Sequence, residues 1–158
     1  RLKEALAVIR EVLAVAESPR QITGLAPVLV NHAASLNLAK LRAEVWEIGL
    51  SGRLGWLVEN TYQALDAEIR TKKLSARWVA RYHRAQAALN LFLSISNKQR
   101  TAVSGSSEED ILDPGIASED TLKEVKAGRS EVSKTWRIVT RIRPEDFQRA
   151  LEDARGAD

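Results

Sequence analysis

Apolar residues in the first two thirds of the chain recur at spacings of three and four, a pattern typical of amphipathic helices. The pattern predicts helices over residues 1–17, 27–49, 54–70 and 76–98. The first two carry two apolar seams each, so we expect each of them to pack against more than one neighbour. The predicted fold class is therefore mainly α, built on a helical bundle of about four helices.

The pattern changes after residue 100. Residues 100–118 are rich in Ser, Gly, Pro and acidic residues and predict a polar linker. A short helix is predicted over 119–127, and alternation of apolar and polar residues predicts a β-strand over about 132–142. Pro144 begins a last helix. We therefore divide the chain into a helical bundle and oligomerisation domain (1–100), a linker (101–118) and a small C-terminal α/β segment (119–158).

The predicted strand has no obvious partner in the sequence. A lone strand leaves its backbone donors and acceptors unpaired. One solution is pairing with the same strand of another subunit, which predicts a homo-oligomer, or with a partner that uses the strand as an edge. The alternatives are that the segment is coil packed on the bundle, or that it pairs with residues not recognised as a strand.

The residue types limit the chemistry that the chain can carry. There is no cysteine and there are two histidines, so thiol chemistry and thiolate metal sites are excluded and no metal site is predicted. No glycine-rich phosphate loop, catalytic triad or transmembrane run is present. We expect a cytoplasmic protein that is not an enzyme and needs no cofactor. Position 1 is Arg and not Met, so we also expect residues upstream of it.

Charge is distributed unevenly along the chain. Residues 1–103 carry 15 Lys and Arg against 8 Asp and Glu, a net charge of +7, whereas residues 104–158 carry 9 against 13, a net charge of −4. Between Arg70 and Arg100 there are eight basic residues and no acid. Such asymmetry indicates a polyanionic partner for one face of the protein.

Five of these basic residues recur at helical spacings of 3, 4, 4 and 3. If the helix breaks near Thr71–Leu74, the last three still share one face. A row of guanidinium groups suits contact with successive phosphates, so we predict nucleic-acid binding here. The alternative is a solvated face whose acids come from another helix, such as Glu59, Asp66 or Glu68. The predicted contact residues are Arg70, Lys73, Arg77, Arg81 and Arg84.

The two histidines differ in setting. His32 lies on an apolar seam and is expected to be a core histidine. Arg77 and His83 match the spacing of arginine, five residues and histidine that is used by helical ribonucleases of the HEPN type. That family prefers a polar residue after the arginine, where this chain has Trp78. A ribonuclease using Arg77 and His83 is the enzymatic alternative.

Long helices with double seams, an acidic linker, a strand and a short final helix together resemble the small subunit of a phage terminase. The resemblance implies a ring-forming subunit, in many cases with an inter-subunit barrel of strands, that loads DNA for a packaging motor. The chain departs from the family in having no clear N-terminal helix-turn-helix. The resemblance concerns architecture, so it transfers no functional residue.

Two other functions fit the same observations. One is the helical small subunit of a CRISPR effector complex, which is compact, basic and non-catalytic and binds nucleic-acid backbone. The other is a helical protein-interaction module that binds no nucleic acid. The expected partners are therefore other copies of the chain, nucleic acid and a larger protein complex, and no membrane.

Overall fold

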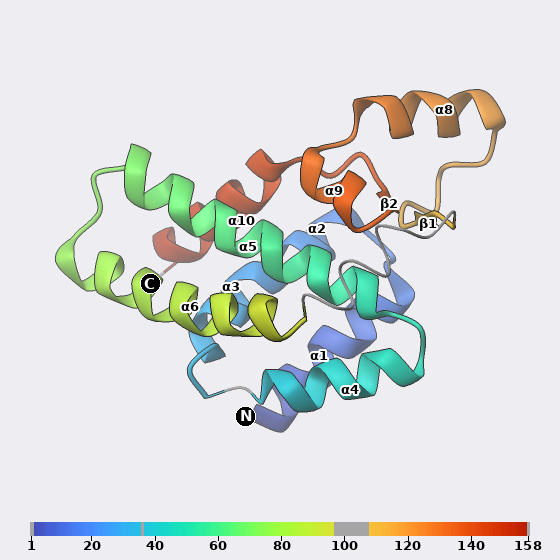
Figure 1. Ribbon diagram of the computed structural model, residues 1–158. Coiled ribbons are helices and arrows are strands. Elements are labelled where there is room, and N and C mark those ends of the chain that lie inside the picture. The colour runs from blue at the N-terminus through green and yellow to red at the C-terminus, as the bar shows by residue number, and fades with distance from the viewer. Residues whose placement is uncertain (1, 36, 97–107, 158) are drawn as a thin grey trace.

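The computed structural model describes residues 2–35, 37–96 and 108–157 of the chain (Figure 1). These residues form a mainly helical fold with one two-stranded sheet. Up to residue 96 the elements are α1 (Leu2–Val15), α2 (Pro19–Thr23), α3 (Leu25–His32), α4 (Leu38–Glu47), α5 (Ser51–Thr71) and α6 (Ala76–Ile95). From residue 108 they are β1 (Asp110–Ile111), α8 (Glu119–Gly128), α9 (Glu131–Thr135), β2 (Ile138–Val139) and α10 (Pro144–Gly156).

Helix α5 is the centre of the fold. Its residues 54–58 are all buried, so the helix has contacts around its whole circumference. Helices α6 and α10 pack along it, and α3 and α4 contact it as well. In Figure 1, α5 runs between α6 and α10. The core of the protein therefore surrounds this helix.

The prediction of a mainly α fold is confirmed. The predicted helices over 54–70, 76–98 and 119–127, and the helix beginning at Pro144, correspond to α5, α6, α8 and α10. Residues 97 and 98 of the second lie outside the described residues. The expected number of about four helices was too low, because one predicted helix is divided in two and segments predicted as a connector and a strand contain α2 and α9.

The predicted helix over 27–49 is wrong as a single element. The chain turns between His32 and Leu38, and the segment forms α3 and α4. Asn37 begins α4, and its Oδ1 accepts a hydrogen bond from Lys40 N at 2.9 Å. The heptad spacing continued across this turn, but an asparagine cap satisfies backbone donors that a helix N-terminus leaves free. The expected connector over 20–26 likewise contains α2, which Ser18 caps.

The predicted strand over 132–142 is mostly wrong. Residues 131–135 form α9, whose first turn is capped by Ser130 Oγ accepting from Ser133 N at 3.2 Å. Arg137 then has φ 58°, a left-handed conformation that changes the chain direction, and only Ile138 and Val139 are strand. This β2 pairs in parallel with β1, with Asp110 opposite Ile138. β2 thus has a partner strand within the chain, so it is not the lone strand from which pairing between subunits was inferred.

The C-terminal elements share their core with the N-terminal helices. Trp56 of α5 donates from Nε1 to Ser133 Oγ at 3.0 Å and meets Phe147 of α10 edge to face, with ring centroids 5.5 Å apart. Trp136 and Phe147 belong to the same buried cluster as Ile9 of α1. The described parts of residues 1–100 and 119–158 therefore bury their apolar residues together.

Candidate nucleic-acid interface

The predicted basic stripe is divided by the turn between α5 and α6. Helix α5 ends at Thr71, and Ser75 caps α6 by accepting a hydrogen bond from Trp78 N at 3.4 Å. Arg70 lies in the last turn of α5 and Lys73 in the turn itself, whereas the other three arginines lie on α6. The stripe is therefore not one continuous helical row, although its members remain close to one turn of the chain.

Three of the five predicted residues form an exposed basic surface, which consists of Lys73, Arg77 and Arg84. None of the three forms an ion pair with a carboxylate in the described part of the chain. Arg77 and Arg84 are seven residues apart, which places them on the same side of α6 and about 10 Å apart along its axis. That separation corresponds to roughly three base steps along one strand of a DNA duplex.

The other two predicted residues are held by the protein. Arg70 Nε lies 2.9 Å from Asp66 Oδ2, one turn earlier on α5. Arg81 donates to Asn31 Oδ1 of α3, and its guanidinium carbon lies 4.9 Å from the centroid of the Trp78 ring. Arg81 therefore joins α6 to α3, and only part of it remains exposed. Nothing in the spacing of the basic residues indicated the contact with Asn31, which comes from a helix 50 residues earlier.

The alternative to phosphate contact is a solvated face whose charges are neutralised by Glu59, Asp66 and Glu68. Asp66 pairs with Arg70, as that interpretation expects. Glu59 instead accepts from Trp136 Nε1 at 3.1 Å, and Glu68 pairs with Arg155 of α10. Asp66 therefore meets a member of the predicted basic stripe, Arg70.

A buried polar cluster joins the first turns of α6 to the neighbouring helices. Glu68 is fully buried, and its Oε1 lies 2.8 Å from Arg155 Nη2. Arg155 Nη1 donates to the hydroxyl of Tyr82 at 2.6 Å, and Tyr82 packs edge to face on Trp78. This cluster connects α5, α6 and α10, so it holds the helix that carries Arg77 and Arg84 in a defined place.

The surroundings of this cluster shift the pKa of two of its groups, Tyr82 and Arg155. Burial raises the pKa of the Tyr82 hydroxyl above its ordinary value, and the hydrogen bond from Arg155 lowers it in part. For the Arg155 guanidinium, burial alone lowers the pKa, but the hydrogen bonds to Tyr82 and Glu68 outweigh burial and raise the pKa overall. Arg155 thus remains charged, as a buried partner of Glu68 must.

The two histidines lie on different helices. His32 is half-buried at the end of α3, and His83 is exposed on α6. The six-residue offset places Arg77 and His83 about 120° apart around the helix axis. The Arg77 guanidinium instead lies against the Trp78 ring, 5.8 Å from its centroid.

The described residues offer neither a metal site nor a membrane-spanning helix. In that part of the chain, no three His, Asp or Glu side chains gather so that they could hold a metal ion. No described helix has the length and apolar content needed to cross a membrane. Comparisons with family models, curated proteins and solved structures find no match to this chain.

Proposed function

We propose that the protein is a non-catalytic assembly subunit that binds the backbone of nucleic acid through Lys73, Arg77 and Arg84. The observation that carries the proposal is the exposure of these three cations near one turn of the chain, with no described carboxylate paired to them. Cations that are already neutralised gain little from a phosphate, so the unpaired ones supply the affinity.

The same surface supports backbone contact more than base reading. Arg77 and Arg84 project from the outer side of α6, and the adjoining aromatic ring, Trp78, is covered by the guanidinium groups of Arg77 and Arg81. A ring covered in this way is not free to stack on a base. Contact with phosphates positions a protein on a duplex without reading its sequence, so we propose binding with weak sequence preference.

DNA packaging as the small subunit of a phage motor is the specific role we propose within this class. Its support is the combination of an unpaired basic surface with exposed apolar side chains, which are typical of a protein that also meets other chains. Arg42, in the middle of α4, donates to the carbonyl of Ile95 at 3.2 Å, so α4 lies beside the C-terminal end of α6. The exposed large apolar side chains of α4, of the residue that follows it and of α6 are Trp46, Ile48, Leu91 and Ile95.

A helical protein-interaction module is the second candidate, and those four apolar side chains favour it. In that function the basic surface binds an acidic protein, and nucleic acid is not required. The small subunit of a CRISPR effector complex remains a third proposal, distinguished from the packaging role by a preference for RNA-containing duplexes.

The test measures binding of the protein to labelled duplex DNA, duplex RNA and a single strand of equal length. Fluorescence anisotropy gives the binding constant at each of a series of salt concentrations. For three phosphate contacts, log K is expected to fall with log salt with a slope of about −3 on duplex DNA. The variant Arg77→Glu/Arg84→Glu is expected to lose the binding, and Arg141→Glu, which reverses an exposed charge elsewhere, is the matched control.

Equal binding by the wild type and the double variant contradicts the proposal. If neither binds nucleic acid but both bind a protein partner, the interaction-module function is correct instead. Circular dichroism of both variants establishes that a loss of binding does not come from a loss of helix.

A further inference from the structure

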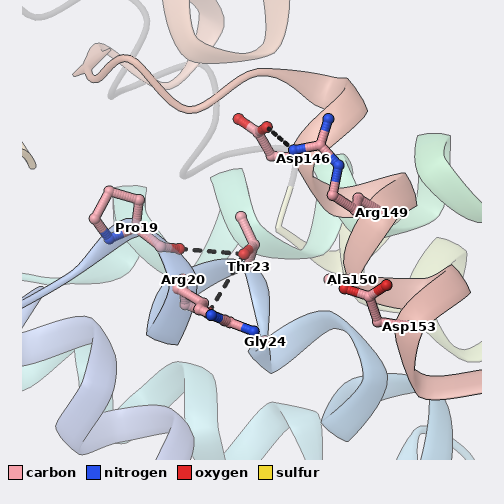
Figure 2. A pocket seen from close by; sticks show the side chains of 8 residues that line it. All are labelled: Pro19, Arg20, Thr23, Gly24, Asp146, Arg149, Ala150 and Asp153. Atoms are coloured by element: carbon pink, nitrogen blue, oxygen red, sulfur yellow. Dashed lines mark hydrogen bonds and ion pairs between the residues drawn. The ribbon is translucent and has the colours of Figure 1, made fainter. Parts of the chain in front are cut away.

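A cleft of about 630 Å³ lies between α2 and α10, and none of Lys73, Arg77 and Arg84 lines it. Small residues, Gly24 of α2–α3 and Ala150 of α10, contribute to its lining. Charged side chains of both signs line it from the two helices, as Figure 2 shows. The cleft therefore combines a surface that permits close approach with charges that select what can enter. Its charged residues are Arg20, Asp146, Arg149 and Asp153.

These four charged residues form few close ion pairs within the described part of the chain. Arg20 and Asp153 are exposed, and neither forms an ion pair with a described residue. The contact between Arg149 Nη1 and Asp146 Oδ1 is loose, at 3.8 Å, and Asp146 Oδ2 already accepts from Arg143 N at 2.8 Å. Figure 2 places Arg20 and Asp153 on the two helices that face each other across the cleft. An occupant that carries both signs satisfies all four groups better than they satisfy one another.

Helix α8 also carries charges of both signs, and its last residue lies beside the start of α10, where Arg143 Nη1 donates to the carbonyl of Gly128 at 2.5 Å. It packs on β2 and projects beyond the body of the protein (Figure 1). Val125 faces inward and is buried, whereas an outer face with the helical spacing 0, 3, 4 and 7 is exposed. This outer face consists of Asp120, Lys123, Glu124 and Ala127.

The outer face of α8 is also unpaired. No described residue forms an ion pair with Asp120, Lys123 or Glu124, although the neighbouring Lys126 lies 3.7 Å from Glu109. Ala127 and Gly128 are exposed at the end of the helix and are small enough to approach Gly24 and Ala150 closely. The outer face thus offers charges of both signs that can pair with the charges of the cleft, and small residues at its end.

We propose that the outer face of α8 from one copy of the chain docks into the α2–α10 cleft of a second copy. Glu124 then pairs with the arginines Arg20 and Arg149, and Lys123 pairs with Asp153. The inference deepens the proposed function, because it rests on the self-association of an assembly subunit and names the surfaces that make it. Strand pairing between subunits is not needed.

The two surfaces of this contact are different, so the interface is heterologous. In a docked pair one copy still has a free cleft and the other a free α8, so further copies can add until a ring closes or a filament extends. The basic surface of Lys73, Arg77 and Arg84 takes no part in the contact. Every subunit of such an assembly would therefore present it to nucleic acid.

The experiment uses two charge-reversed variants of the whole chain, one for each surface. The cleft variant is Arg20→Glu/Arg149→Glu, and the α8 variant is Asp120→Lys/Glu124→Lys. Sedimentation velocity over a series of protein concentrations is expected to show assembly of the wild type and a dissociation constant at least about tenfold weaker for either variant alone. An equimolar mixture of the two is expected to assemble again, because each variant's altered surface then meets its opposite.

Three outcomes bear on the inference. Arg141→Glu is the matched control and is expected to assemble like the wild type, since Arg141 is exposed outside both surfaces. Assembly of the single variants at wild-type strength, or no recovery in the mixture, overturns the inference but leaves an assembly subunit in place. A wild type that stays monomeric overturns it as well, and the anisotropy assay for nucleic acid then decides separately whether the proposed function survives.

Discussion

The six-membered ring of Trp136 packs directly on the Cα atom of Gly55. A β-carbon at Gly55 would lie within the van der Waals radii of Trp136 Cη2, Cζ3 and Cζ2. Trp136 is 1% exposed, and its Nε1 donates to Glu59 Oε1 one turn further along α5. In this contact Trp136, at the end of α9, packs against α5. The contact therefore attaches the C-terminal elements to the N-terminal ones.

Replacing Gly55 with Ala is therefore expected to destabilise the protein, although alanine is the better helix former. Forcing a methyl group into a filled position costs roughly 1–3 kcal/mol of the free energy of unfolding. Urea denaturation followed by tryptophan fluorescence measures the change. Gly128→Ala in α8 is the matched control: its β-carbon meets no atom within 4 Å, so this variant should gain up to about 1 kcal/mol. Equal effects at the two positions contradict the packing argument.

Acid is expected to weaken the contacts through which Glu109, next to β1, holds Arg129 and Arg137 of the C-terminal elements. Its carboxylate accepts two hydrogen bonds from Arg129, at 2.7 and 3.2 Å, and lies 3.1 Å from Arg137 Nη2. The hydrogen bond from Arg129 is the main cause that lowers the pKa of Glu109 below its ordinary value of 4.5 in the folded state. A lowered folded pKa means that the stabilisation is complete above pH 4.5 and is lost as the pH falls through the folded value.

The variant Glu109→Gln tests this pH dependence. At pH 7 it should lower the free energy of unfolding by roughly 1–3 kcal/mol, because Arg129 loses a charged acceptor. The difference from the wild type should shrink as the pH falls below 4.5, where the wild-type carboxyl takes up its proton. Glu131→Gln removes a carboxylate that is 90% exposed and should leave the acid profile unchanged. A pH-independent difference for Glu109→Gln would show that the ion cluster does not titrate as described.

The buried pair of Glu68 and Arg155 should show strong coupling. Removing Glu68 alone, as Glu68→Leu, leaves Arg155 buried without a charge partner and should cost about 3–5 kcal/mol. The double variant Glu68→Leu/Arg155→Met has no uncompensated charge and should be more stable than Glu68→Leu. A double-mutant cycle from chemical denaturation gives the coupling energy, and additive effects would contradict it.

Single neutralisations separate the cations that meet phosphate from those that support the helix. Arg77→Gln and Arg84→Gln should each reduce the magnitude of the salt slope for duplex DNA by about 1. Arg70→Gln should reduce it less, because Asp66 already pairs with Arg70. Equal effects at Arg70, Arg77 and Arg84 would favour a diffuse positive field over defined contacts.

Arg81→Gln should behave differently from the other arginine variants. It removes the contact with Asn31 and the cation–π contact with Trp78, so its main effect should be on stability. Thermal unfolding and DNA binding measured on the same preparation distinguish the two effects. A wild-type melting temperature together with a reduced salt slope would instead place Arg81 among the phosphate contacts.

Local sequence signals were sufficient for some elements and not for others. Helices α5, α6 and α10 follow from apolar spacing and from Ser75 and Pro144 at their starts. The turn before α4 and the start of α9 were missed, although Asn37 and Ser130 are ordinary capping residues. In both places a longer periodic pattern was given more weight than a single cap. The strand failed for a related reason, since alternation over residues 132–142 describes a helix, a turn and a short strand equally well.

The sequence by itself determined the helical class, the positions of the long helices and the concentration of basic residues around the α5–α6 turn, because these depend on neighbours along the chain. The tertiary structure decided which cations are paired, since Asp66 and Asn31 engage Arg70 and Arg81 and leave Arg77 and Arg84 unpaired among the described residues. It also decided that Trp136 requires a glycine at position 55, and that Arg20 faces Asp153 across a cleft. These relationships join residues dozens of positions apart, and no local pattern encodes the packing that brings them together.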